Sequence, residues 1–459
     1  MAVHSLIPFL LSLSSLLPTI SSSSTASPVI GINYGQVANN LPTPAEVLPL
    51  VRSVGAGRLK LYDTDPTVLR AFAGTNIEFV VGLPDQLVPK IRDPAAALSW
   101  IKTNLQPHIP RTKITAVTIG NEILSGNNTL LIQSLIPAIQ SVHSALVSLN
   151  LDRQVAVTTA HSLTILSTSY PPSAGAFRRD LLPYISPLIN FLNKTGSPFL
   201  INAYPFFAYK ADPKRVSLDY VLFEPSVGVV DSGTGLRYRN MLHAQVDAVV
   251  TAIAAAGGGK TVEVRVSETG WPSAGDEDEV GATLENARRY NGNLMKMVAE
   301  GKGTPMQPRS PLQVYVFALF NENMKPGPAS ERHYGLFKPD GTLAYDIGVS
   351  APAVNSTTSG GDDGIGRGDE NSPLFGSTSP GSYYTVYSAV MRYHEMKRHR
   401  DSRHSPLDID CSELDHEHII LYSDWSSRSD KFIMDFYKEQ MNEVLPDGKR
   451  REFFNVDDW

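Results

Sequence analysis

The chain has 459 residues, of which 42% are hydrophobic and 19% charged, values that are ordinary for a globular protein and exclude overall disorder. The formal net charge of -6 at pH 7 gives no electrostatic case for nucleic-acid binding, which usually needs a concentrated basic face. The single cysteine, Cys411, excludes an intramolecular disulfide, so stability must come from core burial in a large domain.

The N-terminus has the features of a secretory signal peptide over residues 1–27. Residues 6–17 form an apolar run broken by Pro8 and by serines, and small residues follow at 21–27. A membrane-spanning helix needs about 20 mostly apolar residues, so this run is too short for an anchor. We therefore expect a protein secreted to the extracellular space or cell wall, and no membrane span elsewhere in the chain. Acceptor triplets for N-glycosylation at Asn127, Asn193 and Asn355 fit export, although such triplets also arise by chance.

Between residues 28 and 353 the sequence alternates short β-rich runs with helical stretches. Several runs, such as residues 78–83, are almost continuously apolar, which is typical of strands covered on both faces. The expected strands are residues 29–34, 58–62, 78–83, 114–121, 154–159, 199–204, 263–268 and 312–320. The expected helices are residues 43–54, 94–105, 130–148, 184–194, 238–256 and 284–299. Thr43 is expected to cap the first helix, with Pro44 at its first helical position.

Eight strands alternating with helices across residues 28–353 predict an α/β fold of the (β/α)8 TIM-barrel type, which spans roughly 200 to 400 residues. A doubly wound sheet is the alternative, and its first strand is usually followed by a glycine-rich turn. Here the turn at residues 35–40 has no second glycine, so the barrel is favoured.

The composition changes after residue 353. Residues 354–382 are rich in Ser, Gly, Thr and Asp, which is typical of a solvated linker. Residues 383–459 form a charged, irregular tail whose role the sequence does not define. One amphipathic helix is expected within it, at residues 430–445. Residues 449–459 are not hydrophobic, so a signal for a GPI anchor is not supported.

Two glutamates close strongly apolar strands. Glu122 follows the fourth expected strand directly, beside Gly120 and Asn121, and Glu268 ends the seventh. Catalytic groups of TIM barrels lie at this C-terminal rim and come from different strands. One such residue alone is most simply a solvated glutamate at a strand end, but two of them favour a catalytic pair. Hydrolysis of a glycosidic bond needs a proton donor for the leaving oxygen and a carboxylate facing the anomeric carbon.

A series of motifs makes the resemblance specific. The chain contains Ile-Asn-Tyr-Gly at 32–35, Thr-Ile-Gly-Asn-Glu at 118–122, Tyr-Pro-Pro-Ser at 170–173, Asn-Ala-Tyr-Pro-Phe-Phe at 202–207, Val-Ser-Glu-Thr-Gly-Trp-Pro-Ser at 266–273 and Phe-Asn-Glu-Asn at 320–323. In this order the series resembles the plant endo-β-1,3-glucanases of glycoside hydrolase family 17. The resemblance implies a retaining endo-hydrolase in which Glu122 is the acid/base and Glu268 the nucleophile. It also implies β-1,3-glucan as the substrate.

Further residues of these motifs are candidates for substrate binding. They are Tyr34, Asn121, Tyr204, Phe207, Trp271 and Glu322. Aromatic rings stack on the apolar faces of sugars, and the resemblance gives Asn121 a hydrogen bond to a sugar hydroxyl. Three of these residues have a rival interpretation: Asn121 as a turn residue, Phe207 as a core side chain, and Glu322 as part of a structural salt bridge.

The pairing of two glutamates also predicts a pH dependence. The charge of Glu268, with partial burial, is expected to raise the pKa of Glu122, which gives a working range on the acidic side of neutral. We expect no cofactor, no metal and a monomer. Rival functions are a β-1,3-1,4-glucanase, a β-1,3-glucanosyltransferase and a glucan-binding protein without activity. Retention of both glutamates within intact motifs argues against the last of these.

Overall fold

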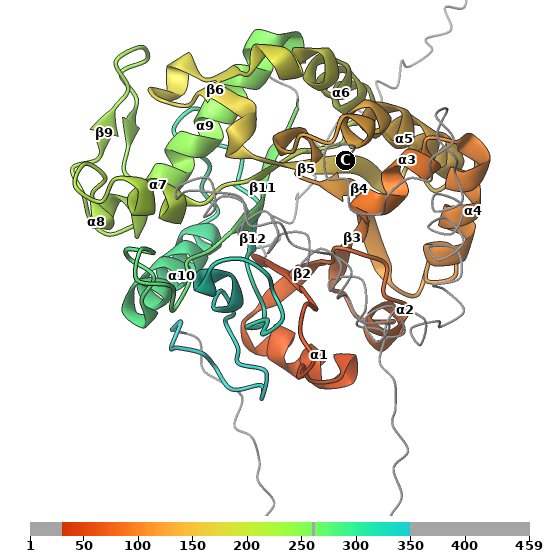
Figure 1. Ribbon diagram of the computed structural model, residues 1–459, viewed down its shortest axis with the longest axis horizontal. Coiled ribbons are helices and arrows are strands. Elements are labelled where there is room, and N and C mark those ends of the chain that lie inside the picture. Colours follow the sequence, from red (N-terminus) through yellow and green to blue (C-terminus); the bar gives the residue numbers. More distant parts are fainter. Residues whose placement is uncertain (1–29, 259–261, 349–459) are drawn as a thin grey trace, which may run out of the picture. The chain divides into compact units, whose positions relative to one another are not determined.

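The computed structural model describes residues 30–258 and 262–348. Eight parallel strands close into a barrel in the order β1-β12-β11-β8-β5-β4-β3-β2 (Figure 1). Their bounds are β1 (Ile30–Asn33), β2 (Ala56–Lys60), β3 (Glu78–Leu83), β4 (Lys113–Asn121), β5 (Ala156–Ser162), β8 (Phe199–Asn202), β11 (Val264–Thr269) and β12 (Val314–Val316). All eight predicted strands and the TIM-barrel class are confirmed. The last strand stops at Val316, earlier than predicted.

Four parts of the sequence-based interpretation lie outside the described residues. They are the signal peptide at 1–27, the linker at 354–382, the tail at 383–459 and the acceptor residue Asn355. They stay predictions.

Helices surround the barrel (Figure 1). The six predicted helices are confirmed as α1 (Pro44–Ser53), α4 (Pro94–Asn104), α5 (Thr129–Ser148), α6 (Leu182–Thr195), α9 (Met241–Ile253) and α10 (Leu284–Ala299). The α9 helix begins later than predicted, because Arg237 and Tyr238 form strand β10 (Arg237–Tyr238), which pairs with β9 (Val229–Val230). Four short helices were not predicted: α2 (Pro66–Ala71), α3 (Val88–Ile91), α7 (Pro205–Ala211) and α8 (Leu218–Val221). A second unpredicted hairpin pairs β6 (Leu166–Thr168) with β7 (Ala176–Phe177).

Side-chain caps fix where several helices start. The side chain of Asn128 accepts a hydrogen bond from the Leu131 amide at the start of α5, and Asn240 caps α9 in the same way. At α1 the Glu46 carboxylate accepts the Thr43 amide at 2.8 Å, and Pro44 stands at the first helical position as expected. These caps set the lengths of the loops that join strands to helices.

The barrel interior is filled by side chains from strands that are not neighbours. Val80 on β3, Ala116 on β4 and Tyr315 on β12 form one buried cluster, although β12 does not border β3 or β4. The ring of Tyr315 packs against Gly31 on β1, where a Cβ atom would lie 2.5 Å from the ring. The larger apolar cluster lies between the strands and the helices. Polar side chains are therefore left to gather at the ends of the strands.

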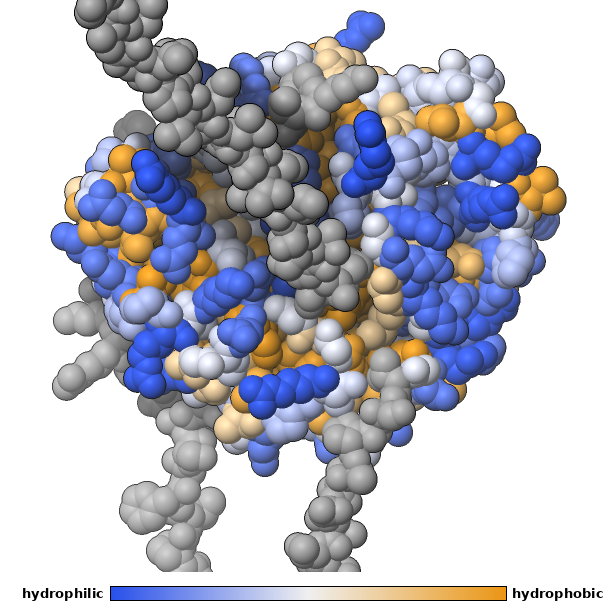
Figure 2. All heavy atoms as spheres, turned by 180° about the vertical axis from the view of Figure 1, so that it is seen from behind, coloured by the Kyte–Doolittle hydropathy of each residue, from blue (hydrophilic) through white to orange (hydrophobic). Residues whose placement is uncertain are grey.

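Helix α5 is a long apolar helix of the barrel. By length and composition alone it is the one described helix that qualifies as a membrane span, with a mean hydropathy of 1.5. The sequence predicts no membrane span beyond the N-terminus, and this composition test alone does not decide that prediction. In the structure its buried residues, including Leu135, Ile139 and Val142, belong to the core that covers β4 and β5. The surface in Figure 2 mixes polar and charged side chains with scattered apolar ones.

Candidate active site

Polar side chains from five barrel strands meet at the C-terminal ends of the strands. Glu268 lies on β11, Lys60 ends β2, Asn33 ends β1 and Asn202 ends β8, while Glu122 follows β4 directly. Lys60 and Tyr204 donate to Glu268, Asn202 donates to Glu122, and Asn33 donates to the Ser267 carbonyl, in hydrogen bonds that span 64 to 234 residues of sequence. Only closure of the barrel brings these residues together.

The end of β4 is distorted, and the distortion aims Glu122 into this cluster. Gly120 has φ +65° and Glu122 has φ +57°, both in the left-handed region, and the pairing of β4 with β5 shifts between Thr118 and Asn121. The positive φ of Gly120 favours glycine there, and a Cβ atom would also crowd the side chains of Ile123 and Asp85. The Glu122 amide donates to the Ala160 carbonyl at 2.9 Å, which anchors the residue. The bulge breaks the alternation that would turn Asn121 and Glu122 to opposite faces.

Glu268 is a buried carboxylate that accepts three hydrogen bonds. Oε1 accepts from Lys60 Nζ and from the Tyr62 hydroxyl, each at 2.7 Å, and Oε2 accepts from the Tyr204 hydroxyl at 3.0 Å. Its residue is 6% exposed and Lys60 is 1% exposed. Burial pushes the pKa of Glu268 upward, but the charge and hydrogen bond of Lys60 and the bond from Tyr62 outweigh it and hold the pKa below its usual value. Glu268 is therefore an anion.

Glu122 has the opposite environment. Burial and the charge of Glu268 raise its pKa from 4.5 to about 7, against a smaller lowering by the hydrogen bond from Asn202 and by Lys60. The Asn202 amide nitrogen donates to Oε1 of Glu122 at 2.8 Å. Below pH 7 this carboxyl holds a proton and can donate it.

Asn202 links the two glutamate strands. Its side-chain oxygen accepts from the Ser267 hydroxyl at 2.6 Å, which leaves the amide nitrogen to face Glu122. The Ser267 carbonyl in turn accepts from the Asn33 side chain at 3.0 Å. These bonds fix the orientation of the Asn202 amide, so its nitrogen and not its oxygen faces Glu122.

A second group of charges borders the pair. Glu322, 2% exposed, accepts from the Val37 amide at 2.8 Å and lies 3.9 Å from Lys325 Nζ. Lys325 also lies 3.6 Å from Glu331 and 4.1 Å from the centre of the Phe317 ring. Burial raises the pKa of Glu322, partly offset by Lys325 and the Val37 amide. Gly35 makes room for Glu322, since a Cβ atom there would lie 2.5 Å from its Oε1.

Comparison with known proteins fits this arrangement. Residues 30–349 match the family model described as glycosyl hydrolases family 17. The chain belongs to glycosyl hydrolase family 17.

Curated relatives of the family cover most of the chain. Glucan endo-1,3-beta-glucosidase 11 of Arabidopsis thaliana is 54% identical over 392 residues, covering 83% of this chain and 90% of that protein. Glucan endo-1,3-beta-glucosidase 10 of the same plant is 57% identical over 333 residues, covering 72% and 78%. Among solved structures, a beta-1,3-glucanase and allergen of Cryptomeria japonica pollen is 39% identical with a TM-score of 0.67, covering 71% of this chain and all of that one. A plant beta-glucan endohydrolase, from a study of two with distinct substrate specificities, is 38% identical with a TM-score of 0.64, covering 69% and 99%.

Within the family 17 barrel, two of the six residues expected to bind substrate have an accessible position or a free polar atom. Phe207 is 47% exposed, and its ring packs against Tyr204 with a centroid distance of 5.4 Å. The backbone amide of Asn121 donates to Asp85 Oδ1 at 2.8 Å, and the side-chain oxygen of Asn121 accepts no hydrogen bond from the described residues. Tyr204 is half-buried, and its hydroxyl is used by Glu268.

The structure buries two of the aromatic residues expected to bind substrate. Trp271 is fully buried, with its ring against Phe206 and Tyr290 and its Nε1 donating to the Gly281 carbonyl at 2.7 Å. Tyr34 is 2% exposed and belongs to the core, with its ring centre 6.1 Å from that of Phe320. Neither ring offers an open face to a sugar, because core side chains cover both.

Several residues of the site were missed from the sequence. They are Lys60, Tyr62, Asn202, Lys325 and Glu331. Lys60 carried a signal: it stands between Leu59 and Leu61 in a strand expected to be buried, and a buried cation needs an anionic partner. Asn202 also carried a signal, because it opens the motif at residues 202–207. Tyr62, Lys325 and Glu331 gave none, because they lie in no quoted motif and only the fold shows that they reach the site.

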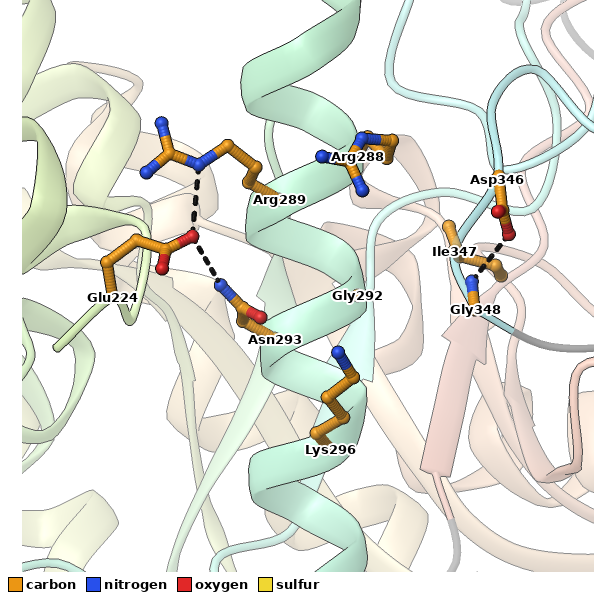
Figure 3. A pocket seen from close by; sticks show the side chains of 9 residues that line it. All are labelled: Glu224, Arg288, Arg289, Gly292, Asn293, Lys296, Asp346, Ile347 and Gly348. Atoms are coloured by element: carbon orange, nitrogen blue, oxygen red, sulfur yellow. Dashed lines mark hydrogen bonds and ion pairs between the residues drawn. The ribbon is translucent and has the colours of Figure 1, made fainter.

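A groove of about 160 Å³ lies along α10, and none of its lining residues contacts Glu122 or Glu268 (Figure 3). Its basic side chains are largely paired: Arg288 binds Glu285 at 2.7 Å, and Arg289 binds Glu224 at 3.0 Å. The charge available to an anionic ligand is therefore small.

Proposed function

We propose that this protein hydrolyses internal β-1,3 linkages of a glucan with retention of configuration, with Glu122 as acid/base and Glu268 as nucleophile. The observation that carries the proposal is the opposite protonation of two neighbouring glutamates. Lys60, Tyr62 and Tyr204 keep Glu268 ionised, while burial beside that charge raises the pKa of Glu122 to about 7. Such separation of two carboxyl pKa values assigns an acid and a nucleophile.

In the first step, the Glu268 carboxylate attacks the anomeric carbon as the glycosidic C–O bond breaks. Glu122 gives its proton to the departing oxygen, and an ester joins Glu268 to the sugar. The lowered pKa of Glu268 suits this role, because a weakly basic carboxylate is also a good leaving group in the second step. A general base that activates water would need a higher pKa.

In the second step, Glu122 takes a proton from water, and the water oxygen attacks the anomeric carbon. The ester breaks, the sugar leaves with its original configuration, and Glu268 regains its charge. Esterification has meanwhile removed the negative charge that raises the pKa of Glu122. Its pKa therefore falls just when it must act as a base.

The choice of substrate rests on the relatives. Curated relatives at 54% and 57% identity are glucan endo-1,3-beta-glucosidases, and a similar structure at 39% identity is a beta-1,3-glucanase. The exposed ring of Phe207, beside Tyr204, offers a stacking surface for a sugar next to the pair.

The test is to incubate the protein with linear β-1,3-glucan and, separately, with mixed-linkage β-1,3-1,4-glucan, and to identify the products. We expect short β-1,3-oligosaccharides whose newly formed reducing ends are first released as the β-anomer, seen by NMR. Glu122→Gln and Glu268→Gln should both abolish this release. Preference for the mixed-linkage polymer, longer products formed by transfer to sugar, or binding without cleavage would each replace the proposal with the corresponding rival function.

We also propose that residues 1–27 direct export and that the secreted protein acts as a monomer. Asn127 and Asn193 are exposed, which supports their use as glycan acceptors together with Asn355. Expression in a secretory plant or yeast host tests this through N-terminal sequencing and glycopeptide mapping. Light scattering of the secreted protein measures its oligomeric state, and a dimer would refute the monomer.

A further inference from the structure

A buried carboxylate outside the catalytic pair joins three loops at the same end of the barrel. Glu279, in the loop between β11 and α10, is 4% exposed. Its Oε1 accepts from Lys210 Nζ at 2.9 Å and from the Ser330 hydroxyl at 2.7 Å. Its Oε2 accepts the Ser330 amide at 2.9 Å and the Asp276 amide at 3.1 Å. The donors come from α7, from the loop of Glu279 itself and from the segment after β12.

Neighbouring bonds hold the same segment. Asp276 accepts the Ala329 amide at 2.9 Å, one residue before Ser330. The Ser273 amide and hydroxyl donate to the His333 carbonyl at 2.8 and 3.0 Å. The loop between β11 and α10 therefore fixes residues 329–333 at both ends. Of these contacts, the two between Glu279 and Ser330 are the most buried.

Aromatic packing connects the fixed segment to the catalytic pair: the ring of Tyr334, directly after the segment, lies 5.8 Å from that of Tyr204, whose hydroxyl donates to Glu268. Glu331 follows Ser330 directly, and Arg332 closes the loop by donating to the carbonyls of Lys325 and Gly327, each at 3.0 Å. Lys325 and Glu331 lie 3.6 Å apart. After stronger influences, the charge of Lys325 lowers the pKa of Glu268, and the charge of Glu331 raises the pKa of Glu122.

We propose that Glu279 is a positioning residue for catalysis: it holds residues 329–333 so that Lys325 and Glu331 keep fixed positions relative to Glu268 and Glu122. This inference rests on the proposed function, because it assigns Glu279 a part in that reaction. The alternative is that Glu279 only stabilises the fold. A buried charge is weak evidence for stability by itself, since desolvation opposes its attraction to Lys210. The two interpretations differ in what happens to the pH profile.

The test replaces the charge and keeps the shape. In Glu279→Gln, the side chain loses its negative charge opposite Lys210 and presents an amide group to the Ser330 and Asp276 donors. When the segment loosens, Lys325 moves away from Glu268, so the apparent pKa of the acidic limb of kcat/KM should rise. Glu331 moves away from Glu122, so the apparent pKa of the alkaline limb should fall. We expect the pH profile of kcat/KM to narrow by roughly half a pH unit on each side. Glu285→Gln, which removes an exposed carboxylate paired with Arg288, is the matched control and should keep the wild-type profile.

Each outcome decides the matter. A folded Glu279→Gln with both limbs unchanged shows that the residue is merely structural and overturns the proposal. Should Glu279→Gln fail to fold, Ser330→Ala removes one donor from the same bond set, and it must both narrow the profile and speed amide exchange in residues 325–333. If the wild-type protein does not cleave β-1,3-glucan, the proposed function fails separately. Amide exchange in Glu279→Gln then tests whether Glu279 holds residues 329–333, and unchanged exchange in residues 325–333 refutes that claim.

Discussion

Replacing Lys60 by Met tests the electrostatics of the nucleophile most directly. The change removes a cation 2.7 Å from Glu268, in a pair whose side chains are 1% and 8% exposed. At an effective dielectric constant of about 20, two unit charges at 2.7 Å attract by 332/(20 × 2.7), or about 6 kcal/mol. Desolvation offsets part of this attraction, and removing one partner of a buried pair costs about 3–5 kcal/mol. We expect a destabilisation of that size near neutral pH.

The cost should depend on pH in a defined direction. In the wild-type protein the pKa of Glu268 is lowered, so its pairing contributes stability above the ordinary glutamate pKa of about 4.5 and loses it as the pH falls below that value. In Lys60→Met, burial acts on Glu268 without the cation and raises its pKa. The variant is therefore penalised most where Glu268 is forced to ionise, at pH 7. The penalty shrinks as the pH falls, because protonation of Glu268 in the variant removes the unpaired buried charge.

The same shift should reach the kinetics. The acidic limb of kcat/KM on linear β-1,3-glucan reports the pKa of the free-enzyme nucleophile. It should move upward by on the order of two pH units in Lys60→Met, because the lost charge lay in direct contact. Release of reducing ends between pH 3 and 9 measures this limb, and thermal unfolding at pH 4 and pH 7 measures stability.

Two controls separate charge from packing. Lys60→Arg keeps the cation and should keep the acidic limb close to wild type. Lys113→Met breaks a surface pair with Glu78, where the lysine is 54% exposed, and should cost less than about 1 kcal/mol at either pH. A folded Lys60→Met with an unchanged acidic limb, or with the same loss of Tm at pH 4 and pH 7, would refute the reasoning.

Three further predictions follow from the site and its surroundings. Glu122→Gln should lower kcat on β-1,3-glucan about 10³-fold and remove the alkaline limb near pH 7 from the pH profile. Azide should restore turnover of an aryl β-1,3-glucoside by this variant. No azide rescue would argue against an acid/base role. Phe207→Ala should raise KM for β-1,3-oligosaccharides several-fold with little change in Tm, whereas Trp271→Ala should lower the free energy of unfolding by about 3–5 kcal/mol; the reverse pattern would contradict the burial of these rings. Burial pushes the pKa of Glu279 upward, but hydrogen bonds from Ser330, Lys210 and Asp276 outweigh it and lower the pKa to about 2. The stability advantage of wild type over Glu279→Gln should therefore be full above about pH 4.5 and disappear as the pH falls toward 2. Urea titrations across this pH range measure the difference.

The barrel was predictable because each strand can be recognised from its own short stretch of sequence. Runs such as residues 78–83 and 114–121 are apolar for most of their length, and chain order alone then gives the parallel neighbours. The short helices were not predictable in the same way. Helices α3 and α8 have four residues each, about one turn, so no apolar periodicity can appear in them.

The site was predictable only as far as the motifs reached. Glu122 and Glu268 end strands, and strand ends point to the barrel rim. Trp271 stands three residues after Glu268 and seemed to share its environment by adjacency. Beyond Thr269, however, the chain passes Gly270, whose Cβ would collide with the Phe317 carbonyl, and the indole enters the core. Adjacency in sequence says little about direction once a strand has ended.

The roles of the two glutamates depend on their donors more than on their burial. Glu268 is the more buried residue, yet its pKa is the lower one, because a cation and two hydroxyls donate to it while Glu122 receives a single neutral amide. Lys60 ends β2 and Tyr62 lies just beyond it, so two of the donors that keep Glu268 ionised are positioned by a barrel strand. Glu331, which adds to the raised pKa of Glu122, comes from the segment after β12. That segment also carries Lys325, whose charge lowers the pKa of Glu268, so family members that share the strands but differ in that segment should differ in both limbs of their pH profile.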